Sequence, residues 1–192
     1  MGCGTGEFLA YLNHKGYNVQ GIEPSGTARE QATRNHTLDV VSDIDQIPAK
    51  GQFEIITLWH VLEHVYDLNG TLDKLHTRMM AGGLLVIAVP DRESWDAQHY
   101  RTNWAAYDTP RHLFHFRQRD MSRLLSDHGF QLVNTKRMWF DAAYVSILSE
   151  RYRGAPQGVA MLKGIFMGFL SNLVAIFSSG PTSSSLYFAQ KR

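Results

Sequence analysis

The feature that most constrains the fold is an alternation of strand-like apolar runs with helix-like segments along the whole chain. The two clearest runs are FEIITLW (residues 53–59) and LLVIAV (84–89), and a helix-like segment at 68–80 separates them. Two parallel strands need a long crossover of this kind. The pattern therefore predicts a Rossmann-like α/β fold with a doubly wound, mostly parallel sheet and helices on both faces. Both runs are dense enough in apolar residues to predict burial on both faces.

The remaining expected elements continue the same rhythm within a single domain of 192 residues. Segment 95–117 is too long for a simple connection, so it is expected to be a lid or acceptor loop. The mainly helical stretch 142–178 is expected to be an insertion before the last strand. The other expected helices lie at 6–15, 27–35 and 118–128, and the other expected strands at 17–22, 131–140 and 184–190.

Composition narrows the classes of function and the compartment. Nineteen basic and eighteen acidic side chains give a net charge of +1, so no nucleic-acid partner is expected. The single cysteine, Cys3, excludes an internal disulfide framework and a Cys-rich zinc site. No signal peptide is visible at the N-terminus, so a cytoplasmic location is expected.

One stretch, residues 158–177, has about the length of apolar sequence that crosses a bilayer. Lys163 and Asn172 interrupt it, and its three glycines weaken it as an isolated helix. We therefore expect residues 144–178 to cover the sheet or the cofactor mouth, or to form a homodimer contact. Membrane association is the less favoured alternative.

A glycine loop followed by an acid suggests a cofactor site. The sequence GCGTG (residues 2–6) opens the first expected helix, where small residues let a ligand approach the free N–H groups of the helix start. The next expected strand ends at Glu23, whose carboxylate can accept hydrogen bonds from both hydroxyls of a ribose. Further on, Asp43 could meet an adenine amino group and Ile44 could pack on the ring. The combination predicts an adenosine-type cofactor.

These motifs resemble a known family. GCGTGEFL, GIEPS, SDIDQIP, FEIITLWHVLEHVYD and DTPRHLFHF are similar to motifs of class I S-adenosylmethionine-dependent methyltransferases. The nearest subgroup resembles ubiquinone-biosynthesis O-methyltransferases. GCGTG differs from the dinucleotide pattern GxGxxG, which favours the methyl donor over NAD. The resemblance implies methyl transfer from S-adenosylmethionine to a small-molecule acceptor, with a hydroxyl oxygen as the first choice.

The resemblance also implies where the cofactor binds. The glycine loop would hold the methionine half, Glu23 the ribose, and Asp43 with Ile44 the adenine, while residues 58–60 would border the sulfonium. The implied cofactor-binding residues are Gly2, Cys3, Gly4, Thr5, Gly6, Glu23, Pro24, Asp43, Ile44, Leu58, Trp59 and His60.

The sequence departs from the family pattern at one point. Members of the family carry a strand immediately before the glycine loop, and here only Met1 precedes it. Because that strand lies in the middle of the sheet, its loss would leave two neighbouring strands with unpaired edges. We therefore expect a truncated chain, apparently missing its first strand, that is less stable than a chain extended upstream. A methyltransferase-like binding module without catalysis is an alternative.

The histidines carry the acid–base hypotheses. HVLEH (residues 60–64) also matches H-x-x-E-H, so a metal-dependent hydrolase using His60, Glu63 and His64 is an alternative. The motif follows an apolar strand without a spacer, which places His60 in a loop and predicts no metal site. In segment 108–116 two more histidines lie among aromatic residues and could form an acceptor pocket. The alternative is a folded surface loop in which Asp108 and Arg111 form a structural pair. The expected acid–base candidates are His112, the first choice, His60 and His115.

Overall fold

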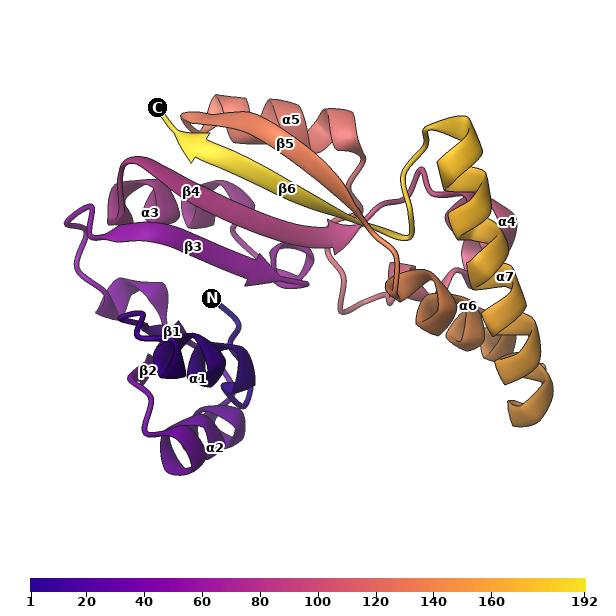
Figure 1. The fold of residues 1–192 in the computed structure, drawn as a ribbon, viewed down its shortest axis with the longest axis horizontal. Helices are drawn as coiled ribbons and strands as arrows, with labels where there is room; N and C mark the ends of the chain where they lie inside the picture. The colour runs from indigo at the N-terminus through magenta and orange to yellow at the C-terminus, as the bar shows by residue number, and fades with distance from the viewer.

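A computed structural model describes all 192 residues and confirms the α/β fold (Figure 1). The main sheet has four strands in the order β3-β4-β6-β5. β3 (Phe53–Trp59) and β4 (Met79–Pro90) are parallel, whereas β6 (Ser184–Lys191) runs antiparallel to both β4 and β5 (Phe130–Met138). The sheet is therefore mixed, because the last strand returns against its neighbours.

A second, smaller unit holds about the N-terminal quarter of the chain. Its strands β1 (Gly21–Ile22) and β2 (Val40–Val41) pair in parallel, and α1 (Glu7–His14) and α2 (Gly26–His36) belong to the same unit (Figure 1). The strand expected over residues 17–22 is too long. Only its last two residues pair, because β2 offers a ladder of just two residues.

The core forms where α3 (Leu68–Arg78) and α5 (Gln118–Asp127) bury leucines and a methionine against the central strands. The first of these helices was expected to reach residue 80, which is two residues too far. The helix ends at Arg78 because the next residue, Met79, already pairs with Phe53 in the sheet. The side chains at the centre of this core are Leu72, Leu75, Leu85, Ile87, Met121 and Leu125.

β3 was expected to be buried on both faces, and this is also wrong. Within β3 only Leu58 is buried, and Ile55 is 56% exposed. An apolar groove of about 770 Å³ lies between β3 and the N-terminal unit. Its lining includes Met1, Phe8, Leu9, Ile22, Phe53, Ile55 and Ile56.

The N-terminus crosses this groove. The amino group of Met1 donates to the carbonyl oxygen of Thr57 (3.0 Å). The N–H of Gly2 donates to the carbonyl oxygen of Ile22 (2.7 Å). β1 and β3 therefore face each other without pairing, and the first two residues touch the edge of each. This arrangement agrees with the expectation of unpaired edges on two neighbouring strands.

Segment 95–117 folds into α4 (Trp95–Tyr100) and two short 3₁₀ turns, η3 (Arg101–Asn103) and η4 (Ala105–Tyr107). The expected insertion forms a helical hairpin of α6 (Asp141–Tyr152) and α7 (Gln157–Ser178). The hairpin lies beyond the carboxyl ends of β3, β4 and β5 and packs on α4 and η4 (Figure 1). Of the three expected roles, covering the sheet is not the one observed, because α6 and α7 contact each other, α4 and the 3₁₀ turns instead of the strands. The cofactor mouth and a homodimer contact stay predictions.

Candidate active site

The glycine loop has the backbone that a close ligand approach requires. Gly2, Gly4 and Gly6 all have positive φ values, of 67°, 55° and 91°. A Cβ at Gly6 would lie 2.7 Å from Leu38, whereas one at Gly4 would meet nothing within 4 Å. The middle of the loop therefore faces open space, and Gly4 is required by conformation rather than by crowding. Burial raises the pKa of the Cys3 thiol, so this neighbour in the loop is unreactive.

Glu23 joins the glycine loop to the end of β1. One carboxylate oxygen accepts a hydrogen bond from the N–H of Gly4 (2.8 Å) and the other from that of Ser25 (2.9 Å). The guanidinium of Arg29 donates to the carbonyl oxygens of Glu23 and Pro24. The structure thus brings together the loop, the acid and Pro24, as the sequence predicted, and the N–H of Gly4 is bonded to the carboxylate.

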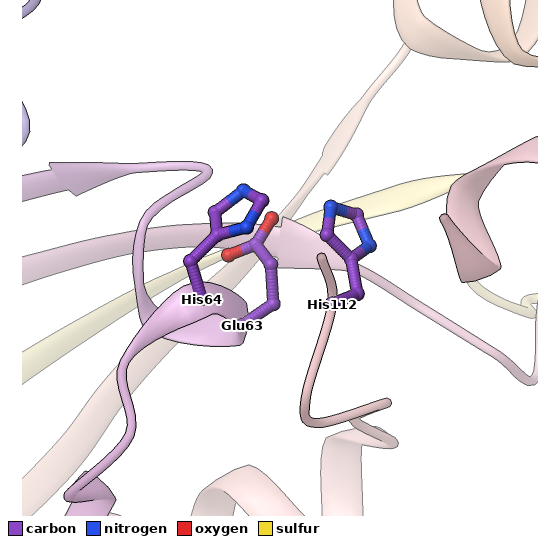
Figure 2. Close-up of side chains that lie close together, drawn as sticks. All are labelled: Glu63, His64 and His112. Atoms are coloured by element: carbon purple, nitrogen blue, oxygen red, sulfur yellow. The ribbon is translucent and has the colours of Figure 1, made fainter. Parts of the chain in front are cut away.

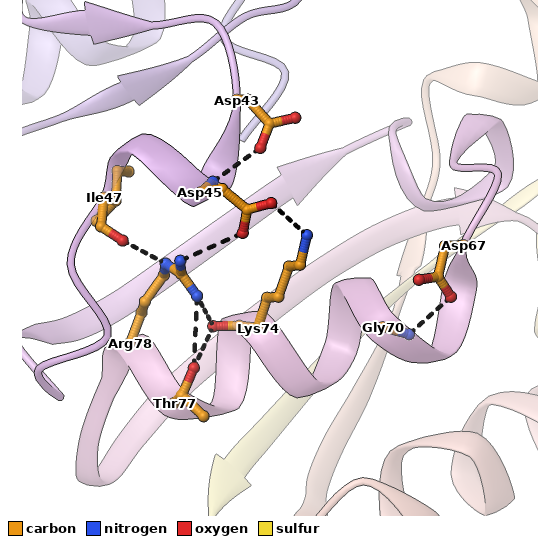
Figure 3. Close-up of polar contacts among 8 residues, drawn as sticks. All are labelled: Asp43, Asp45, Ile47, Asp67, Gly70, Lys74, Thr77 and Arg78. Carbon is orange, nitrogen blue, oxygen red and sulfur yellow. Dashed lines mark hydrogen bonds and ion pairs between the residues drawn. The ribbon is translucent and has the colours of Figure 1, made fainter.

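The turn expected to border an adenine is η1 (Ile44–Gln46). The carboxylate of Asp43 accepts from the N–H of Asp45 (2.8 Å) and caps the turn. Ile44 is buried in the main core, so its side chain does not lie free for a ring. A polar network fixes this turn to α3 (Figure 3): Arg78 donates to the carbonyl oxygen of Ile47 (2.8 Å), and Lys74 contacts Asp45 at 2.6 Å.

The three residues expected beside the sulfonium differ in what they can do. The side chain of Leu58 is completely buried in the core, so it cannot line a cofactor site. Trp59 is 38% exposed, and its ring meets that of Phe8 edge-on at 5.8 Å. His60 has a positive φ of 52°, a sparsely populated conformation that often marks a functional turn. Of the three residues, only Trp59 and His60 have side chains that are exposed and could contact a ligand.

His60 lies between two carboxylates. Its Nδ1 is 3.3 Å from Oε1 of Glu63, and its Nε2 is 3.2 Å from Oδ2 of Asp141. Burial alone would lower the pKa of His60, but the two acids outweigh it and raise the pKa to about 9. Although burial opposes it, His60 in turn holds the pKa of Asp141 below its usual range. His60 is therefore a cation at neutral pH.

Sequence reasoning missed Asp141. This residue begins α6, directly after β5, and lies 81 positions from His60 in the sequence. Its place just beyond the carboxyl end of a strand is the signal that could have identified it, because ligand-binding residues of α/β sheets gather there.

Glu63, His64 and His112 form a second cluster (Figure 2), in which one ligand atom of each lies within 4.8 Å of the others. Nδ1 of His64 lies 3.1 Å from the carbonyl oxygen of Arg111, and Nδ1 of His112 lies 2.8 Å from that of Ala106. Carbonyl oxygens only accept, so each Nδ1 carries a hydrogen, and in the neutral ring of His112 Nε2 keeps a lone pair. Glu63 is completely buried, and its Oε2 has no hydrogen-bond partner.

This cluster differs from the set expected for H-x-x-E-H. Both ring nitrogens of His60 face carboxylates, so the structure does not offer His60 as a third metal ligand. His112 takes that place beside Glu63 and His64, and the three side chains could hold a divalent cation. Burial lowers the pKa of His112, so its ring is neutral near pH 7.

The lid is fixed around this cluster. The backbone N–H of Leu113 donates to the carbonyl oxygen of Glu63 (2.8 Å), and Nε2 of His115 lies 2.9 Å from the carbonyl oxygen of Tyr107. Arg111 pairs with Asp108 at 2.8 Å, which confirms the expected structural pair. A pocket of about 360 Å³ opens at the surface here, lined by His64, Tyr66, Pro110, Arg111 and Leu113.

Two aromatic residues of segment 95–117 have a structural role. Tyr100 and Trp104 are buried in a separate cluster under the lid. The indole of Trp104 donates to Asp96 (2.7 Å), which also accepts from the hydroxyls of Ser171 (2.8 Å) and Ser183 (2.6 Å). Asp96, which the sequence analysis did not single out, therefore ties α4 to α7 and to the start of β6.

The ion pairs of His60 predict a pH dependence of stability. The pKa of His60 is higher in the folded than in the unfolded chain, so its contribution is complete below about pH 6.5 and is lost as pH rises through about 9. The ring is 39% exposed, and we expect a loss of about 1–2 kcal/mol in the free energy of unfolding after solvent screening. Urea titrations at several pH values measure it.

His60→Gln is the matched variant for this prediction. It removes the titrating group, so the decline between about pH 6.5 and 9 should disappear. A decline of unchanged size in this variant would assign the pH dependence to another group.

Comparisons with known proteins point in one direction. A family model described as a methyltransferase domain matches residues 1–135. Ubiquinone biosynthesis O-methyltransferases from Rhodopseudomonas palustris and Pseudomonas aeruginosa are 30% and 32% identical over 98 and 101 residues, which is 48% of this chain in each case. The matches cover 39% and 43% of those proteins, so the chain spans about two-fifths of the length of the curated relatives it matches.

Solved structures share the fold. A SAM-dependent methyltransferase from Archaeoglobus fulgidus superposes with a TM-score of 0.66 at 19% identity, covering 99% of this chain and 83% of that one. A 1,6-didemethyltoxoflavin-N1-methyltransferase from Burkholderia thailandensis, with bound S-adenosylhomocysteine, gives 0.60 at 14% identity, covering 99% and 68%. At sequence identities this low, the similarity to these structures shows a shared fold and nothing more.

Proposed function

Because this chain belongs to the methyltransferase-domain family and is an S-adenosylmethionine-dependent methyltransferase, we propose that it methylates a hydroxyl oxygen of a small molecule. The observation that carries the proposal is the neutral imidazole of His112, which lies beside Glu63 and His64 under the lid with Nδ1 held by the carbonyl oxygen of Ala106 and Nε2 3.9 Å from Oδ2 of Asp108. A hydroxyl must lose its proton as it is methylated, and a neutral imidazole can accept that proton.

The cofactor supplies an activated methyl group, and the chain's own residues then have to orient two reactants and exclude water. The open glycine loop and Glu23 fit the cofactor, because Gly4 faces open space and the Glu23 carboxylate, which accepts one hydrogen bond at each oxygen, has lone pairs left for ribose hydroxyls. Holding the hydroxyl in line with the methyl supplies much of the rate by itself. Similarity to O-methyltransferases of ubiquinone biosynthesis, at about 30% identity, supports oxygen as the accepting atom.

His60 takes a positioning role in this proposal. Its raised pKa keeps the ring protonated at neutral pH, so it is not the base. The imidazolium holds Glu63 and Asp141 together, which fixes the turn after β3 against the start of α6. His115 is also a positioning residue, because its Nε2 is directed to the carbonyl oxygen of Tyr107.

Cofactor affinity tests the ribose assignment. Glu23→Ala should weaken S-adenosylmethionine binding by about one to two orders of magnitude, since charge-assisted hydrogen bonds contribute about 1.5–3 kcal/mol. Isothermal titration calorimetry measures the change. Glu7→Ala is the matched control, because the Glu7 carboxylate is exposed and bonds only the hydroxyl of Thr5. Unchanged affinity in Glu23→Ala would remove the ribose assignment.

A second candidate function is methyl transfer assisted by a divalent cation. The observation that favours it is the convergence of Glu63, His64 and His112, in which Oε2 of the buried Glu63 has no partner while Oε1 lies 3.3 Å from Nδ1 of His60. Metal analysis of the purified protein before and after EDTA distinguishes the candidates. Full activity in the metal-free protein supports His112 as a base. Activity lost with EDTA and restored by Mg²⁺ or Zn²⁺ supports the cation.

The accepting atom is tested by an acceptor screen. The protein is incubated with methyl-labelled S-adenosylmethionine and matched phenols, amines and carbon acids, and mass spectrometry follows the label. Label on a phenolic or alcoholic oxygen is expected. Label confined to nitrogen or carbon would overturn the proposed acceptor class while leaving the cofactor assignment intact.

A further inference from the structure

α7 is apolar on all sides. This helix of 22 residues has a mean hydropathy of 1.8 over an 18-residue window, and only 28% of that window is buried. By length and composition it could cross a membrane. It carries no acidic residue, and Lys163 is its single charge. A helix that is apolar all round is normally enclosed by protein or lipid. Most of the surface of α7 is instead exposed to solvent.

One face of α7 is already occupied. The buried residues on this face are small and pack against α6. A Cβ at Gly164 would lie 2.4 Å from Cα of Ile147, so the backbones are in close contact. The hydroxyl of Ser171 donates to buried Asp96, and the amide of Asn172 donates to the carbonyl oxygen of Trp139 (2.8 Å). α7 is therefore fixed in orientation along its length.

The remaining surface is a continuous run of large side chains, which we call the apolar face of α7. Phe166 is 62% exposed and Phe177 is 85% exposed. On α6 and just before it, Phe140, Tyr144 and Tyr152 are also exposed. The apolar face of α7 comprises Val159, Met161, Leu162, Ile165, Phe166, Phe169, Ile176 and Phe177.

The exposed charges next to the apolar face of α7 are positive. Residues 139–180 contain two acids: Asp141, which is paired with His60, and Glu150, which is buried. The cations Arg151 and Lys163 are exposed, whereas Arg153 lies 3.9 Å from the carboxylate of Glu150 and donates to the carbonyl oxygen of His99. Basic residues flanking exposed phenylalanines and leucines are typical of helices that lie in the interface of an anionic bilayer.

We propose that the α6–α7 hairpin docks on the surface of an anionic lipid bilayer, with the apolar face of α7 in the boundary between headgroups and acyl chains. A second copy of the chain suits this face less well, because it would present the same cations and no exposed acid to neutralise them. A spanning helix would have to carry Lys163 into the hydrocarbon and give up the bonds of Ser171 and Asn172. This docking does not depend on the accepting atom proposed above.

Co-sedimentation of the full chain with lipid vesicles tests the proposal. Vesicles of phosphatidylcholine and phosphatidylglycerol should bind the protein, and vesicles of phosphatidylcholine alone should bind it much less. Phe166→Ser with Phe169→Ser should lower the partition coefficient by about 100-fold, because two large apolar side chains no longer leave water. Lys163→Gln and Arg151→Gln should each lower it by about fivefold on anionic vesicles.

Val133→Ser on β5 is the matched control, since this side chain is also half-exposed and apolar but lies on another element. It should leave binding unchanged, and far-ultraviolet circular dichroism confirms that every variant is folded. Equal sedimentation of the wild type and the double variant would overturn the proposal.

Two other outcomes would replace the proposed occupant. A lipid-independent dimer in light scattering, lost in the Phe166→Ser and Phe169→Ser variant, would assign the face to a second copy. Protein that resists extraction from vesicles by alkaline carbonate would assign it to a spanning helix.

Discussion

Turnover is expected to fall by about 10²–10⁴-fold in His112→Ala, with the affinity for S-adenosylmethionine nearly unchanged. The reason is that Nε2 of His112 has a free lone pair, while Nδ1 is engaged by the carbonyl oxygen of Ala106. The side chain is 10% exposed, and burial lowers its pKa, so the ring is ready to accept a proton near neutrality. Steady-state kinetics and calorimetry on the same preparation separate the two effects.

The pH dependence of kcat is a second test of the same prediction. A base is active only when unprotonated, so kcat should fall as pH drops through the lowered pKa of His112 and stay level above it. His115→Ala is the matched control, because its ring lies in the same lid but is directed to Tyr107. If all single alanine variants of His60, His112 and His115 lose less than about tenfold, orientation alone carries the reaction.

The fold was predictable where local pattern and tertiary pairing agree. β3 begins and ends at the expected residues because an apolar run of β-formers is bounded by polar neighbours and turn residues. The pattern is weaker at residues 79–83, where Gly82 and Gly83 resemble a helix stop but lie inside β4. Within that stretch Met79 pairs with Phe53 of β3, ahead of a register shift, and a single sequence does not show this pairing.

The candidate site was predictable for residues that follow strands within one motif. The glycine loop and Glu23 lie together as expected because each occupies the end of its element. Asp141 was missed because its partner, His60, comes from a distant part of the chain. Ile44 and Leu58 were assigned to the cofactor on motif alone, although their apolar side chains are more stable in the core.

A chain extended before Met1 by one β-strand is expected to unfold at a temperature about 6–12 °C higher than the 192-residue chain. The groove between β1 and β3 is apolar, and the facing edges of these strands are not paired with each other. A strand in the groove would bury several apolar side chains, each contributing about 1.5–3 kcal/mol, against about 1–2 kcal/mol per residue of lost backbone freedom. We expect a net gain of about 3 kcal/mol, which gives that shift.

The first residues already show where such a strand would run. Met1 bonds to Thr57 on β3 and Gly2 bonds to Ile22 on β1, so a strand that ends at Met1 continues both contacts along the groove. Thermal melting compares the chain with an apolar, β-branched extension of about five residues. A glycine–serine extension of equal length is the control and should leave the melting temperature unchanged. Equal melting temperatures for all three chains would mean that the exposed apolar wall at Ile55 and Ile56 needs no strand to cover it.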